Sequence, residues 1–273
     1  MIATPQDAST VILLRDNMGE FASGFEVLMV RRSSKSSFVP SAYVFPGGRV
    51  ERDDSLPQLE RCCRWEDLNK ALSVLENVSQ AKAALGILVA AIRETFEEAG
   101  LLLAYQGGDQ LLSFAGGEME QRLRHYRKSL NAGELNFLQM LEREKLTLAI
   151  DCLHYFSRWI TPELSPLRYD TRFFVAAVPP GQKAIPDGDE VTSHVWITPA
   201  QALQKYRSRN FYMVAPTVVT LEELSVFRTI QEVIDFTKTK NVKSVLTRLI
   251  FAKDEVQEQT PDGRIFGNLP SAD

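Results

Sequence analysis

Cysteine is scarce in this sequence and forms no motif. Cys62 and Cys63 are adjacent, Cys152 is the third, and no CxxC spacing occurs in the 273 residues. This excludes a disulfide framework and the common cysteine-based zinc sites, and it favours reduced thiols of the kind found in the cytosol.

Long apolar runs are also missing. The first residues, "MIATPQDAST", contain no apolar core of a signal peptide, and no run approaches the roughly 20 residues that a membrane-spanning helix needs. The last residues, "NLPSAD", are not a peroxisomal address of the SKL type. We therefore predict a cytoplasmic protein without a membrane partner.

The sequence also lacks an excess of positive charge and lacks glycine-rich loops. The formal net charge is −4, which excludes a general nucleic-acid binder. A polyanionic ligand would then need a local basic patch or a bound cation. No GxGxxG or GxxxxGK[ST] loop occurs, which disfavours the Rossmann and P-loop types of nucleotide site.

Apolar segments alternate with helical patterns, which is typical of an α/β protein. Residues 11–16 and 25–32 predict a hairpin, since turn residues separate them, and 42–50 predict a short strand that runs into a Pro-Gly-Gly turn. Further strands are predicted over 156–162, 171–179 and 193–199, and helices over 56–78, 80–99, 117–146 (in two parts), 199–207, 216–236 and 241–252. The last twenty residues are polar and are predicted to fray.

Residues 80–99 form the clearest predicted helix, which ends at Gly100. Glu94, Glu97 and Glu98 fall within about 100° of arc on it, opposite an apolar stripe. Like charges at this spacing destabilise an isolated helix by ~0.2–0.5 kcal/mol per pair, and they oppose the dipole of the helix C-terminus. A divalent cation would remove both costs, since carboxylate oxygens suit Mg²⁺. The alternative is a solvated acidic face that Arg93 balances.

The pattern Arg-Glu-x-x-Glu-Glu-x-Gly-Leu at 93–101 resembles the second half of the Nudix box, and "FPGGRVE" at 45–51 resembles the Gly-Gly turn at which that box begins. Five residues separate Gly48 from Asp54, which stands where the family has glutamate. Between Asp54 and Arg93 lie 38 residues instead of the family's short spacer. An inserted loop can leave its two ends in place, since loop closure costs little more for a longer loop.

An interrupted box of this kind is similar to that of the peroxisomal coenzyme A diphosphatase branch, which the stretches 27–55, 157–179 and 189–203 also resemble. The resemblance implies a Nudix α/β/α sandwich with a mixed sheet over 9–236, with helical insertions at about 55–80 and 115–147. A C-terminal helix and polar tail at 237–273 would follow. It further implies a Nudix pyrophosphohydrolase that uses Mg²⁺ or Mn²⁺ to cleave coenzyme A or acyl-coenzyme A to 3′,5′-ADP and 4′-phosphopantetheine.

Other functions stay open at this point. ADP-ribose, NADH and dinucleoside polyphosphates are alternative substrates. A Nudix-fold sensor that binds a nucleotide without cleaving it is a second class, although such modules usually lose the box carboxylates. A purely structural acidic helix is a third, and it would leave the Gly-Gly turn unexplained. The expected partner is a small-molecule nucleotide, and a homodimer is not excluded.

The resemblance also implies roles for individual residues. Glu94 and Glu98 would ligate the metal, with Glu97 as a further ligand or as a partner of Arg93, and the carbonyl of Gly48 or Gly47 would add another oxygen. Glu190 matches an acid of a late loop that serves as ligand or general base; Glu94 is the other candidate base, and Asp187 or Asp189 could take the place of Glu190.

Basic and aromatic residues complete the candidates. Arg31, Arg32 and Arg49 lie near the turn and could bind phosphates. Asp54 is expected to be either an outer acid of the site or plain surface. Trp159, Phe173 and Phe174 are typical of a core, with base stacking as the alternative.

Overall fold

Two long apolar strands lie at the centre of the main sheet of this protein. The computed structural model describes residues 2–17, 24–64, 66, 68, 69, 73, 75, 78, 80–114, 117–252 and 255–269. The strands of the main sheet are β1 (Gln6–Asp16), β2 (Phe25–Arg32), β3 (Tyr43–Val44), β4 (Gly47–Arg49), β7 (His154–Ile160), β8 (Tyr169–Ala177), β9 (Val191–Ile197) and β10 (Ser244–Leu246).

The main sheet is mixed. Its order is β10-β7-β8-β1-β2-β3, with β4 paired to β1 and β9 paired to β2. β1 runs parallel to β8 and antiparallel to β2 and β4. The hairpin predicted from residues 11–16 and 25–32 is confirmed, and β4 places the Gly-Gly turn beside the middle of the sheet.

Side chains of β1 alternate between two hydrophobic cores. Val11 and Leu13 pack into one core, whereas Ile12 and Leu14 pack into the other. Successive strand residues point to opposite faces, so a strand that is apolar throughout must be covered on both sides. This is why the chain forms three layers.

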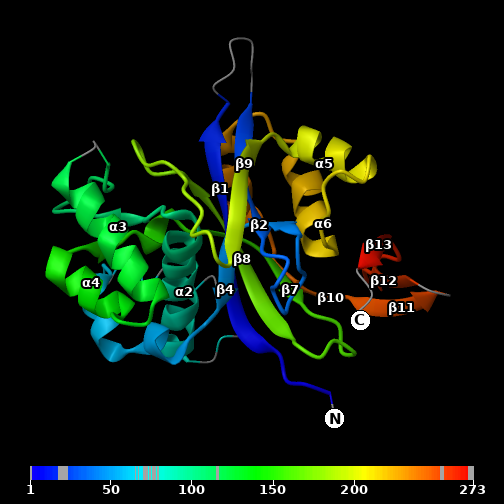
Figure 1. Ribbon diagram of the computed structural model, residues 1–273, viewed down its shortest axis with the longest axis horizontal. Coiled ribbons are helices and arrows are strands. Elements are labelled where there is room, and N and C mark those ends of the chain that lie inside the picture. The colour runs from blue at the N-terminus through cyan, green and yellow to red at the C-terminus, as the bar shows by residue number, and fades with distance from the viewer. Residues whose placement is uncertain are drawn as a thin grey trace.

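Helices cover both faces of the sheet (Figure 1). One face carries α2 (Ala81–Ala99), α3 (Glu118–Asn131) and α4 (Phe137–Glu144), and the other carries α5 (Pro199–Arg207), α6 (Ala215–Leu224) and α7 (Ile230–Thr239). The predicted α/β/α sandwich with a mixed sheet is therefore confirmed. None of the helices in the described ranges combines the length and the apolar character that crossing a bilayer requires.

The two predicted helical insertions differ in outcome. The second is confirmed as α3 and α4, with the break after Asn131. The first begins with two short 3-10 helices, η1 (Arg52–Ser55) and η2 (Pro57–Cys62), instead of the predicted α-helix, and much of 65–79 lies outside the described residues. Three minor elements, β5 (Ala104–Tyr105), β6 (Thr147–Leu148) and η3 (Ile150–Cys152), connect the insertions to the sheet.

The C-terminal region differs most from the prediction. The helix predicted over 241–252 is wrong, since β10 pairs with β7 and β11 (Arg248–Ala252) pairs with β12 (Glu255–Gln259). The frayed tail is wrong over 255–269, where β12 and β13 (Ile265–Leu269) complete an antiparallel sheet, and its residues 254 and 270–273 lie outside the described part of the chain. β-branched residues such as Val245 of β10 and Ile250 of β11 favour strands once partner strands are available. The Pro261-Asp262-Gly263 turn between β12 and β13 was the available sequence signal.

The predicted helix over 216–236 is two helices. α6 ends at Leu224, and α7 begins after Thr229, whose side chain accepts a hydrogen bond from the Glu232 amide. A threonine cap of this kind starts a new helix by satisfying an amide that has no partner within the helix.

Candidate active site

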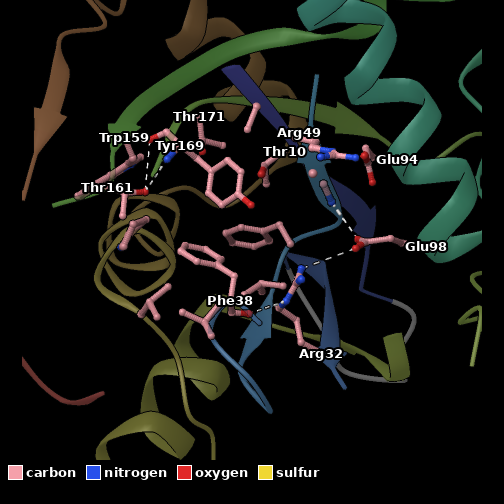
Figure 2. Close-up of a pocket in the computed structure, with 18 of the residues that line it drawn as sticks. Thr10, Arg32, Phe38, Arg49, Glu94, Glu98, Trp159, Thr161, Tyr169 and Thr171 are labelled. Carbon is pink, nitrogen blue, oxygen red and sulfur yellow. Dashed lines mark hydrogen bonds and ion pairs between the residues drawn. The ribbon is translucent and has the colours of Figure 1, made fainter. Parts of the chain in front are cut away.

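A cavity of about 690 Å³ opens beside the C-terminal half of α2. Figure 2 shows its two ends: Glu94, Glu98, Arg32 and Arg49 gather at one, and Trp159, Thr161 and Tyr169 at the other. The first end is called the polar end here. It brings the Gly-Gly turn and the acidic helix together, although some fifty residues separate them in the chain.

The Gly-Gly turn lies directly against the acids of α2. The Gly47 amide donates to Glu98 Oε2 at 3.0 Å, and a Cβ atom on Gly48 would lie 2.5 Å from Glu94 Oε1. At Gly47, a Cβ atom would collide with the Ser9 carbonyl of β1. Only glycine permits this approach of the main chain at either position. The Gly-Gly turn therefore does more than reverse the chain: it brings the main chain into contact with Glu94 and Glu98.

The acidic face of α2 is buried, so the solvated alternative is wrong. Glu98 is 2% exposed and Glu94 9% exposed, while Glu97 is half-buried. The apolar stripe of the same helix packs into the first core, as predicted. Buried carboxylates need hydrogen bonds or positive charge around them.

Arg93 supplies part of that charge. Its Nη1 donates to Glu94 Oε1 at 2.9 Å and to Glu97 Oε2 at 2.7 Å. Its Nε and Nη2 donate to Asp54 Oδ1 at 2.7 Å and Oδ2 at 2.9 Å, and Nη2 also reaches the Arg49 carbonyl. Arg93 thus orients the acids from the wall of the cavity; it is a positioning residue in this geometry.

Asp54 joins the two halves of the interrupted box. It is 2% exposed and accepts both arms of the Arg93 guanidinium together with the Glu51 amide. Burial raises the pKa of Asp54 and works against charge on Arg93, but the hydrogen bond that Arg93 donates to Asp54 and the charges of Glu94 and Glu97 raise the pKa of Arg93 overall. The guanidinium stays charged, and the surface alternative for Asp54 is excluded.

One arginine does not neutralise the whole cluster. Burial raises the pKa of Glu94 to about 7, with the charge of Glu97 adding to the shift against the opposing effect of Arg93. Burial also raises the pKa of Glu98 well above its ordinary range, and the charges of Glu94 and Glu190 add to it. Arg93 beside Glu94 and Arg32 beside Glu98 therefore offset only part of the cost of ionising these two neighbouring carboxyl groups.

The donor set fits a hard divalent ion. Mg²⁺ is commonly held by one or two carboxylates together with substrate phosphates and water. Glu94 Oε2 and the Glu98 carboxylate would serve, with Arg93 fixing Glu94 through its other oxygen. Within the described part of the chain, no three His, Cys, Asp or Glu side chains already surround one point, so the protein by itself holds no complete cage.

Comparison with known proteins shows the family to which the chain belongs. The family model of the NUDT19 Nudix domain matches residues 5–82 and 76–224. The chain belongs to this Nudix family. The predicted family is thereby confirmed, including the branch with the interrupted box, and with it the class of Nudix hydrolases.

Similar proteins agree with this assignment. The chain is 29% identical over 253 residues to acyl-coenzyme A diphosphatase NUDT19 of Xenopus laevis, over 83% of this chain and 67% of that protein. It is 25% identical over 247 residues to the protein of the same name from Homo sapiens, over 79% of this chain and 64% of that protein. The chain thus spans about two thirds of the length of these curated relatives.

A solved structure shares the fold. The NUDIX hydrolase from Alicyclobacillus acidocaldarius superposes with a TM-score of 0.63 at 24% identity, over 86% of this chain and 97% of that chain. This likeness supports the Nudix sandwich as the fold of the chain.

Of the three arginines predicted to bind substrate, two line the cavity and one does not. Arg32 lines the cavity, with Nη1 3.9 Å from Glu98 Oε1 and Nε bonded to the Phe38 carbonyl. Arg49 lines it as well and is exposed beside Glu51. Arg31 follows the alternation of β2 to the other side, over the Tyr43 ring, so the structure does not bring it to the site.

The late-loop acids of the Nudix site also reach the cavity. Glu190, Asp187 and Asp189 line it, and the Glu190 carbonyl accepts the Ser33 amide at 2.8 Å, which ties this loop to the end of β2. Asp187 Oδ1 accepts the amides of Asp189 and Val191 and so shapes the turn. Asp187 is thus engaged in the turn, whereas the charge of Glu190 acts on the buried Glu98 and helps to raise its pKa.

Several cavity residues were missed by reading the sequence. Phe38, Tyr169 and Thr247 come from three distant segments, and only Phe38 carries a local signal, as an aromatic residue within a serine-rich loop. Trp159 and Phe173 are buried, as predicted for core residues, and yet both line the cavity.

The raised carboxyl pKa values lead to a prediction about stability. With Glu94 shifted from near 4.5 to about 7, the metal-free folded protein keeps a proton that the unfolded chain loses between these values. The free energy of unfolding should therefore fall as pH rises from about 4.5 to about 7, by about 3 kcal/mol. Mg²⁺ favours the ionised form, so it should raise Tm more at about pH 8 than at about pH 5.5.

Thermal unfolding with EDTA or with Mg²⁺ at the two pH values measures this effect. NaCl at matched ionic strength controls for screening. Equal increases of Tm at both pH values would show that the buried acids do not take up the ion.

Proposed function

We propose that this Nudix chain hydrolyses the diphosphate of coenzyme A or acyl-coenzyme A, giving 3′,5′-ADP and 4′-phosphopantetheine or its acylated form. The relatives named acyl-coenzyme A diphosphatase support the substrate. The observation that carries the reaction class is the burial of Glu94 and Glu98 against the Gly-Gly turn, at the end of the cavity that also holds Arg32 and Arg49.

The charge at the polar end suits a diphosphate. Glu94 and Glu98, with a main-chain carbonyl of the Gly47-Gly48 turn and Glu97 as further candidate ligands, would hold Mg²⁺ or Mn²⁺. When bound, the ion would offset the charge that develops on the phosphate oxygens during cleavage. The guanidinium of Arg32 is close enough to Glu98 to reach the same phosphate group, and Arg49 lines the same end of the cavity beside Glu94 (Figure 2).

The chain's own residues have distinct tasks in this proposal. Arg93 holds Glu94 and Glu97 in place and does not touch substrate. The Gly47 amide holds Glu98. Glu190 on the late loop, or Glu94 with its pKa near 7, takes the proton from the attacking water.

Product analysis tests the proposed function. Purified protein is incubated with coenzyme A, acetyl-coenzyme A, ADP-ribose, NADH and a dinucleoside polyphosphate, with Mg²⁺, Mn²⁺ or EDTA, and the products are identified by mass. We expect 3′,5′-ADP from the coenzyme A substrates and none with EDTA. Faster cleavage of ADP-ribose or NADH would move the assignment to another Nudix substrate class, and binding without any product would make the protein a sensor.

A further inference from the structure

The cavity continues well beyond the polar end. Its second arm, which we call the far arm, is the end that holds Trp159, and its lining includes Thr161, Tyr169, Thr217, Thr247, Leu249 and Glu258. In Figure 2, Thr161 and Tyr169 lie across the cavity from Glu94 and Glu98. If a ligand binds with its diphosphate at the polar end, the rest of the ligand can extend into the far arm.

The wall of the far arm is built by the C-terminal sheet. Thr247, Leu249 and Glu258 come from the segment around β11 and β12, beyond residue 224, where the match to the family model ends. Leu249 and Glu258 are cross-strand partners. The C-terminal region of the chain, outside the part that the family model matches, thus supplies this wall of the cavity.

Glu258 fixes this wall to the rest of the protein. It is buried, its Oε1 accepts the Thr247 hydroxyl at 2.5 Å, and its Oε2 accepts the Ala215 amide at the start of α6 at 3.4 Å. The strands are therefore held in position over the helix layer, and the wall is part of the folded structure.

The far arm does not suit an anion. Of the described residues that line the cavity, the basic ones are Arg32, Arg49 and Arg93, and all belong to the polar end. The charged group of the far arm is the Glu258 carboxyl, whose pKa burial raises, so a second negative charge there is disfavoured. The hydroxyls of Thr161 and Thr247 are bonded within the protein, to the Tyr169 main chain and to Glu258. The Tyr169 ring, Thr217 and Leu249 thus leave a lining of low charge, which suits an uncharged chain.

Coenzyme A has one charged and one uncharged side. The adenosine side carries the 3′-phosphate, whereas the pantetheine side consists of amides and a thiol or thioester. On this chemistry we propose that the far arm holds the pantetheine and acyl side of the substrate, and that Leu249 limits the length of the acyl chain. This inference rests on the proposed function and adds the determinant of its specificity.

Substitution of Leu249 tests the inference. Initial rates are measured with coenzyme A and with acetyl-, hexanoyl- and decanoyl-coenzyme A for the wild type, Leu249→Trp and Leu249→Ala. Leu249→Trp should lower kcat/KM for the decanoyl substrate at least about tenfold and for coenzyme A less than about threefold, and Leu249→Ala should shift the preference to longer chains. Leu246→Trp, at an exposed position just before the wall, is the matched control.

Each outcome decides one of the two proposals. If the wild type cleaves coenzyme A and both Leu249 variants keep its chain-length profile, or lose all substrates equally, the assignment of the far arm is overturned. A wild type that cleaves only other diphosphates overturns the proposed function and the inference with it. Because Leu249→Ala adds no volume, it gives a result even where Leu249→Trp does not fold.

Discussion

Replacing Glu98 by glutamine is expected to lower kcat about 10³-fold with Mg²⁺ as the cofactor. Glutamine keeps the shape of the side chain and can still accept the Gly47 amide, so the change removes mainly the negative charge. A metal ion contributes several kcal/mol to phosphoryl transfer, and about 4 kcal/mol corresponds to this factor. Steady-state kinetics on the best diphosphate substrate measures the loss.

Stability gives an independent readout for the same variant. Because burial and the charge of Glu94 already raise the pKa of Glu98, a neutral residue should leave the metal-free protein as stable as the wild type or more so. Glu118→Gln on α3, an exposed glutamate far from the cavity lining, should change neither property. A Glu98→Gln enzyme with wild-type kcat would remove Glu98 from the metal site.

Replacing Asp54 by alanine is expected to destabilise the fold by about 3–5 kcal/mol. The substitution leaves the Arg93 guanidinium charged and buried without its bidentate partner, and breaking a buried pair from one side has this cost. It also removes the contact that holds the segment around Asp54 against Arg93 of α2. Denaturant unfolding of the metal-free protein measures the change, with m showing whether the transition stays two-state.

Asp53→Ala is the matched control for Asp54→Ala. Asp53 is the preceding residue in the same short helix but is exposed, so its loss should change the free energy of unfolding by less than about 0.5 kcal/mol. If the two variants unfold alike, the Asp54–Arg93 pair does not join the two halves of the box.

Reading the sequence found what is encoded locally. The end of α2 at Gly100, the start of α5 at Pro199 and the β1–β2 hairpin follow from capping and turn residues that lie within a few positions of each other. The acidic site of the Nudix box could also be predicted, because its residues lie on two successive turns of one helix: Arg93, Glu94, Glu97 and Glu98. Of the three arginines proposed for substrate, the structure brings two to the cavity.

What the sequence did not reveal depends on contacts between distant segments. The acidic face of α2 is buried because β4 places Gly47 and Gly48 against it, and helical periodicity contains no information about that contact. The strands around Val245 and Thr247 form because β7 and β12 supply partners, which overrides a helix-like pattern. The far arm combines residues 161 to 258 and has no linear motif.

The Asp54–Arg93 pair has a consequence for how such enzymes diversify. Since the two anchors are fixed to each other, the intervening stretch can grow or shrink without moving a ligand, and each doubling of its length costs only about 0.6 kcal/mol in closure entropy. The part of that stretch outside α2 and outside the first core, into which it buries Leu59 and Leu85, can accordingly be exchanged. Lengthening it or attaching a fluorescent reporter within it offers a way to follow ligand binding in a hydrolase whose reactive centre is left as it was.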